Sequence, residues 1–135
     1  MNPRVLVIDD EPALRRTLER ALRGMGCEVI SAADAQVAYE LLLGTDVDLV
    51  LLDLHLPQMS GDTFFLALTR RWPHLVERIV LMTGDTYAES GHWPADLRRC
   101  PLLLKPFTLD MLRLTVLAAL KGPSSGGRRA GNGPA

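Results

Sequence analysis

The chain has 135 residues, of which 47% are hydrophobic and 23% charged, a composition typical of one globular domain with its own core. Its 15 basic and 16 acidic residues give a net charge of −1, which argues against a nucleic-acid-binding surface. No apolar run approaches the roughly 18 residues of a membrane span, and no signal peptide is recognisable. The two cysteines, Cys27 and Cys100, cannot build a disulfide framework, so we expect one soluble cytoplasmic domain.

Five short runs rich in Val, Ile and Leu predict β-strands. Most are continuously apolar, as in strands covered on both faces. The runs are residues 4–9, 28–32, 48–53, 78–83 and 101–105. Strands that alternate with helices form a parallel sheet with helices on both faces, and functional groups then gather beyond the carboxyl ends of the strands.

Helical spacing of apolar residues fills the segments between these runs. The first helix is expected to begin at Pro12 and the second to span residues 35–43, with Asp34 as its N-cap. The third is expected near residues 60–72. The last follows Thr108 as N-cap, and its spacing predicts that Leu109, Leu112, Val116 and Leu120 face the core.

Two segments break this regularity. Residues 86–99 contain Gly91 and Pro94, so we expect the fourth helix to be irregular and short, starting near Pro94. From Pro123 onward the chain is mainly Gly, Pro and Ser with no core-forming side chain. The expected organisation is therefore a folded domain over residues 1–122 and a disordered tail or linker over residues 123–135.

Polar residues end four of the five predicted strands. They are Asp9 with Asp10, then Asp53, Thr83 and Lys105. Each has an ordinary explanation by itself, such as a helix cap or a solvated loop residue. Together they supply carboxylates that suit Mg²⁺, a nucleophilic Asp, a hydroxyl and one of only two lysines in the chain. This combination indicates phosphoryl transfer.

The motifs VLVIDDEP, LVLLDLHLP, Gly61, VLMTGD and LLLKPF resemble the CheY-like receiver domains of two-component response regulators. The resemblance covers residues 4–120. It implies a flavodoxin-like fold, a five-stranded sheet of order 2-1-3-4-5. It also implies that Asp53 accepts a phosphoryl group from a histidine kinase or a histidine phosphotransfer protein.

The resemblance assigns further roles. Mg²⁺ would be held by Asp9, Asp10, Asp53 and the backbone carbonyl of His55. Thr83 and Lys105 would bind the phosphoryl oxygens and couple them to loop movement. The loops around the site would be shaped by Pro57, Gly61 and the bond between Lys105 and Pro106, which is often cis in the family.

Four positions modify this expectation. Leu102 occupies the place where many receivers carry an aromatic residue that moves on activation, and Gly84 leaves the phosphoryl group open to access. His55 and Asp85 lie two residues after Asp53 and Thr83, where a polar pair either tunes dephosphorylation or is simply solvated. The edge positions of the second and fifth strands predict that Cys27 and Cys100 are separate thiols, and His74 and His92 are expected on the surface.

Three functions compete. The first is a phosphorylation switch, a signalling protein that catalyses only its own phosphorylation and dephosphorylation. The second is a phosphorylation-independent interaction module, which Leu102 and the irregular fourth helix favour. The third, a haloacid-dehalogenase-type phosphatase, needs a second Asp where His55 stands. The kinase, the signal, the downstream partner, the oligomeric state and whether this is one piece of a larger protein are left open.

Overall fold

The computed structural model describes residues 2–84 and 95–121. The expectations for Asp85, Gly91, His92 and Pro94 and for the tail over residues 123–135 lie outside the described residues.

The core is a parallel sheet of five strands in the order β2-β1-β3-β4-β5, as predicted. Its strands are β1 (Arg4–Ile8), β2 (Glu28–Ala32), β3 (Leu49–Asp53), β4 (Ile79–Thr83) and β5 (Leu102–Leu104). Every residue of β3 and β4 is buried, because helices cover both faces of the central strands. The edge strand β5 is only three residues long.

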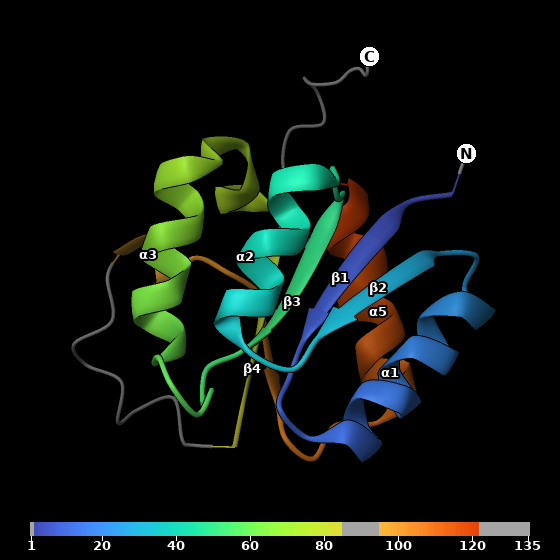
Figure 1. The fold of residues 1–135 in the computed structure, drawn as a ribbon. Coiled ribbons are helices and arrows are strands. Elements are labelled where there is room, and N and C mark those ends of the chain that lie inside the picture. Colours follow the sequence, from blue (N-terminus) through green and yellow to red (C-terminus); the bar gives the residue numbers. More distant parts are fainter. Residues whose placement is uncertain (1, 85–94, 122–135) are drawn as a thin grey trace.

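The helices form a layer on each face of the sheet (Figure 1). One layer holds α1 (Pro12–Gly24) and α5 (Leu109–Lys121), which pack Leu18, Leu22, Leu112 and Val116 against residues such as Val7. The other holds α2 (Ala35–Gly44), α3 (Gly61–Arg71), the 3₁₀ helix η1 (Pro73–Glu77) and α4 (Ala95–Arg98). Successive side chains of each strand enter opposite layers, so both cores are fixed by the same five strands.

Helix ends follow the predicted capping chemistry. The Asp34 carboxylate accepts a hydrogen bond from the backbone N–H of Val37 at 2.9 Å and begins α2. The Thr108 hydroxyl accepts one from the N–H of Met111 at 3.0 Å and begins α5. Both contacts satisfy backbone donors that have no partner inside the helix.

Two expectations about helices need correction or addition. Leu109 was expected to face the core, yet it is 61% exposed, and Ala119 is buried in α5 instead. The reason is that α5 begins beside a three-residue edge strand, which offers too little sheet to cover the first turn. Pro73 ends α3 as expected, but it also opens η1, which the sequence did not predict. The short α4 lies where a short helix was expected.

Candidate functional site

Four strands deliver polar residues to one edge of the sheet. Asp53 and Thr83 are the last residues of β3 and β4, while Asp9 and Lys105 directly follow β1 and β5. The strands are parallel and in register, with Asp53 beside Met82 and Thr83 beside Leu104. The structure thus gathers the predicted residues at the carboxyl edge of the sheet.

Lys105 joins the two buried carboxylates. Its Nζ lies 3.1 Å from Oδ2 of Asp9 and 3.4 Å from Oδ2 of Asp53. Asp9 is fully buried and Asp53 is 2% exposed, whereas the lysine side chain keeps contact with solvent. Two buried acids facing one cation leave an excess of negative charge at this edge of the sheet.

Backbone amides orient both carboxylates. Oδ1 of Asp9 accepts a hydrogen bond from the N–H of Glu11 at 2.8 Å. Oδ1 of Asp53 accepts one from the N–H of His55 at 2.9 Å. In each acid one oxygen is therefore held by the following loop, and the other faces Lys105.

These surroundings shift two pKa values. Burial raises the pKa of Asp53 above its ordinary value, and the neighbouring Asp9 charge adds to this, although the His55 amide and Lys105 act in the opposite direction. Burial by itself lowers the pKa of Lys105. The hydrogen bond to Asp9 and the charges of Asp53 and Asp9 outweigh that effect and raise the lysine pKa overall.

Asp9, Asp10 and Asp53 form an acidic cluster that fits a divalent cation. Each offers one carboxylate oxygen, and these atoms all lie within 4.8 Å of one another. Asp10 is exposed while the other two are buried, so the cluster opens to solvent on one side. Carboxylate oxygens with an open, solvated side are the donors that Mg²⁺ prefers, because it keeps several of its waters.

Thr83 meets a side chain that the sequence did not place beside it. The imidazole Nε2 of His55 lies 3.0 Å from the hydroxyl Oγ1 of Thr83, which is 1% exposed. The parallel pairing of β3 with β4 brings these two residues together. It continues past the end of β3, because the Leu54 N–H donates to the carbonyl of Met82 at 3.0 Å. Sequence reasoning paired His55 with Asp85 instead, and Asp85 lies outside the described residues.

Gly61 occupies a position where no other residue fits. A Cβ there would lie 2.4 Å from Cα of Leu54 and 3.0 Å from the carbonyl oxygen of Asp53. The start of α3 therefore packs directly on the backbone that follows the buried carboxylate. Pro57 lies exposed in the same loop, and the bond between Lys105 and Pro106 is cis, as the resemblance implied.

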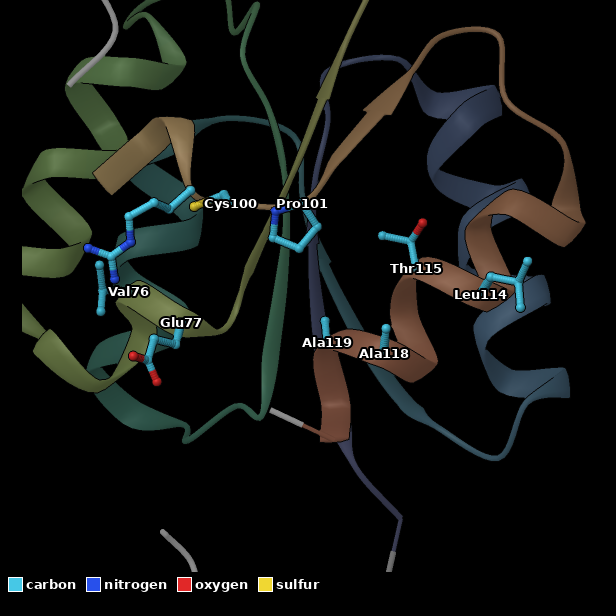
Figure 2. A pocket seen from close by; sticks show the side chains of 9 residues that line it. Val76, Glu77, Cys100, Pro101, Leu114, Thr115, Ala118 and Ala119 are labelled. Atoms are coloured by element: carbon cyan, nitrogen blue, oxygen red, sulfur yellow. The ribbon is translucent and has the colours of Figure 1, made fainter. Parts of the chain in front are cut away.

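Gly84 is exposed, and among the described residues other than its chain neighbours no atom lies within 4 Å of the position a Cβ would take there. A shallow hollow beside Lys105 is lined by Glu11, Leu14 and Phe107 among others. A second hollow, of about 590 Å³, lies away from the carboxylates between η1, the start of β5 and α5 (Figure 2). Its walls include Glu77, Pro101 and Leu114.

The two cysteines are separate free thiols, as predicted from the strand order. Burial raises the pKa of Cys27, and it raises that of Cys100 to about 12, with the nearby Asp96 charge adding to the shift. His74 is exposed, as expected. Across residues 2–84 and 95–121, no helix has the length and apolar character needed to cross a membrane.

Comparison with known proteins gives a consistent family assignment. The family model of the response regulator receiver domain matches residues 5–117. The chain is 35% identical over 122 residues to the sensor kinase CckA of Brucella abortus (strain 2308), covering 87% of this chain and 12% of that protein. It is 33% identical to the regulatory protein AtoC of Escherichia coli (strain K12), covering 87% of this chain and 25% of AtoC. This chain thus spans a quarter or less of the length of these two relatives.

Solved structures show the same fold. The chemotaxis response regulator CheY4 of Vibrio cholerae aligns with a TM-score of 0.79 at 26% identity, covering 88% of this chain and 99% of CheY4. The response regulator TrrA of Thermotoga maritima, solved in complex with Mg²⁺ and BeF, aligns with a TM-score of 0.75 at 26% identity over the same shares.

Proposed function

Because this chain belongs to the response regulator receiver domain family, we propose that it is a phosphorylation switch whose acceptor is Asp53. The observation that carries the proposal is the setting of this carboxylate. Asp53 is buried at the carboxyl edge of the sheet, its Oδ2 lies 3.4 Å from Lys105, and its acidic partners Asp9 and Asp10 lie within cation-binding distance.

The proposed step is transfer from a phosphohistidine. One carboxylate oxygen of Asp53 forms a bond to phosphorus while the bond between phosphorus and the imidazole nitrogen breaks, and the imidazole leaves with that electron pair. Lys105 then binds a phosphoryl oxygen as a point charge, and the Thr83 hydroxyl donates a hydrogen bond to another. Hydrolysis of the aspartyl phosphate returns the free carboxylate.

Mg²⁺ would neutralise charge on the transferred group and orient it when bound. Asp9, Asp10, Asp53 and the backbone carbonyl of His55 are its proposed ligands. The donor set supports this assignment, because the only lysine at the site cannot balance the carboxylates that surround it.

The proposed donor is a histidine kinase or a histidine phosphotransfer protein, and the output is a change in affinity for a downstream protein. New charge at Asp53 acts on Thr83 and the chain that follows it, a local electrostatic event of the kind that biases loop conformations. Two free thiols suit a reducing compartment, so we place this reaction in the cytoplasm. The folded unit is proposed to lie within residues 1–122.

The direct test is intact-mass analysis after incubation with acetyl phosphate and Mg²⁺. We expect one added phosphoryl group on the wild type and none on Asp53→Asn. A matched control is Asp110→Asn, which alters an exposed carboxylate in α5 and is expected to be phosphorylated like the wild type.

Two results would contradict the proposal. An adduct on Asp53→Asn equal to that on the wild type would place the acceptor elsewhere. A wild type that gains no phosphoryl group, with Mg²⁺ present and the fold intact by circular dichroism, would favour the phosphorylation-independent interaction module.

A further inference from the structure

The contact between His55 and Thr83 links two parts of the site that the proposed reaction must change. His55 follows β3 and shares its loop with the phosphoryl acceptor, while Thr83 ends the neighbouring strand β4. Nε2 of His55 and Oγ1 of Thr83 lie 3.0 Å apart, which is a hydrogen-bond distance. The two residues are 28 positions apart in the sequence, so the contact exists only in the folded sheet.

Both ends of this contact are fixed by the backbone. The N–H of His55 donates to Oδ1 of Asp53 at 2.9 Å, which fixes the main chain of this exposed histidine beside the proposed acceptor. The carbonyl of Thr83 accepts a hydrogen bond from the N–H of Lys105 at 2.8 Å, which anchors the threonine to the other phosphoryl-binding residue. The contact therefore lies between two main chains that are each held by a hydrogen bond, and the threonine at one end of it is buried.

The chemistry of the hydroxyl makes this contact competitive with phosphoryl binding. A threonine hydroxyl has one proton to donate, and a phosphoryl oxygen can only accept. If Nε2 accepts that proton, the proton is unavailable to a phosphoryl group. If Nε2 donates instead, it holds the hydroxyl oxygen in place beside His55. With Nε2 as the acceptor, Thr83 must release the imidazole before it can donate to a phosphoryl oxygen on Asp53. With Nε2 as the donor, the hydroxyl keeps its proton, and the contact opposes only a movement of the Thr83 side chain.

We propose that His55 is a positioning residue that latches Thr83 in the unphosphorylated state, so that its hydrogen bond to the Thr83 hydroxyl opposes the switched state. The latch rests on the proposed function, since it acts on the residue that binds the phosphoryl group. The latch sets the fraction of unphosphorylated molecules that remain in the resting conformation. Its strength is that of one hydrogen bond between side chains, which the charged phosphoryl group overcomes.

Beryllium fluoride with Mg²⁺ provides the test, because it mimics the phosphoryl group without being hydrolysed. We would measure its dissociation constant for the wild type, His55→Phe and His55→Gln. The Phe variant keeps a flat ring but loses the nitrogen. We expect it to bind beryllium fluoride about fivefold more tightly, because a fivefold change corresponds to the loss of one hydrogen bond worth about 1 kcal/mol. The Gln variant restores a side-chain amide and should return the dissociation constant toward that of the wild type.

A second background separates a latch from a general structural effect. In Thr83→Val the hydroxyl is absent, so adding His55→Phe should leave the dissociation constant unchanged. In the resting protein without beryllium fluoride, Thr83→Val should also shift the ¹⁵N resonance of the His55 Nε2. That measurement reads the hydrogen bond directly and needs no phosphoryl mimic.

The outcomes divide cleanly. Equal or weaker binding by His55→Phe, or the same tightening in both backgrounds, overturns the latch while leaving the proposed function intact. An unchanged Nε2 resonance in Thr83→Val overturns it as well. A wild type that binds no beryllium fluoride with Mg²⁺ refutes the proposed function, and the latch falls with it.

Discussion

The two halves of the site are built differently. The acceptor side consists of β1, β3 and the loops that follow them, and it carries the three acids and Gly61. The response side consists of β4, α4, β5 and α5, and it carries Thr83 and Lys105. Strands β1 and β3 have five residues each and lie in the interior of the sheet, while β5 has three residues and α4 has four.

We expect this difference to separate the proposed phosphoryl transfer from the response to it. The acids of the acceptor side follow long, buried strands, so their positions are set before any ligand arrives. On the response side only α4 and β5 are short, so a rearrangement of these two elements costs less, whereas β4 is as long and as buried as β3. A receiver needs both, a rigid place for the chemistry and a region that can change when the chemistry is done.

The substitution expected to destabilise the acceptor side most is Gly61→Ala. Its Cβ would lie 2.4 Å from Cα of Leu54, and neither backbone can yield without moving the loop after Asp53. We expect a loss of about 3 kcal/mol in the free energy of unfolding, measured by urea denaturation. Gly24→Ala is the matched control, because among the described residues nothing beyond its own stretch of helix lies within 4 Å of its Cβ position, and its stability should stay within about 0.5 kcal/mol. Equal effects of the two substitutions would disprove the close-packing explanation.

Removing the cation that joins the two halves should have the next largest effect. Lys105→Met leaves the carboxylates of Asp9 and Asp53 facing each other, so we expect a loss of about 2 kcal/mol in metal-free protein. Saturating Mg²⁺ should restore more stability to this variant than to the wild type, since it replaces the missing positive charge. Lys121→Met removes the other lysine, at the exposed end of α5, and should change little. Loss of stability that Mg²⁺ fails to reduce would contradict this account of the site.

A smaller effect is expected on the response side away from the site. The guanidinium of Arg78 donates to the carbonyl of Leu120 at 3.1 Å and to that of Ala119 at 3.5 Å, at the last turn of α5. Arg78→Met should cost about 1 kcal/mol in urea denaturation, because these carbonyls lose their partner. The exposed Arg113→Met in the same helix serves as control. A similar loss in both variants would argue against the capping contact.

The smallest expected effect is an increase in the free energy of unfolding. Because burial and Asp9 raise the pKa of Asp53, its ionisation destabilises the metal-free fold, and Asp53→Asn should be slightly more stable than the wild type at neutral pH. The upward direction of this pKa shift determines how the added stability depends on pH. Below the ordinary pKa of 3.8 both side chains are neutral and the gain vanishes, and it grows as the pH rises until it is complete above the raised pKa. Thermal unfolding of both proteins across this range measures it, and a gain that shrinks with rising pH would refute the assignment.

Much of this molecule follows from local sequence rules. The caps at Asp34 and Thr108 and the gathering of Asp9, Asp53, Thr83 and Lys105 were predicted from the residues, whereas the strand order was implied by the resemblance to receiver domains. The roles of these side chains in phosphoryl transfer remain predictions. Leu109 was wrongly placed in the core, because helical spacing identifies a helix face but does not say how far the neighbouring sheet extends.

What the sequence determined by itself is the set of strands and the polar residue that ends each one, since apolar runs and their terminal residues are local properties. The tertiary structure alone decided which side chains touch. The 3.0 Å contact between His55 and Thr83 and the clearance that excludes a Cβ at Gly61 depend on the register of neighbouring strands and the close approach of separate backbones. Such distances are set by packing across the chain, which no local pattern specifies.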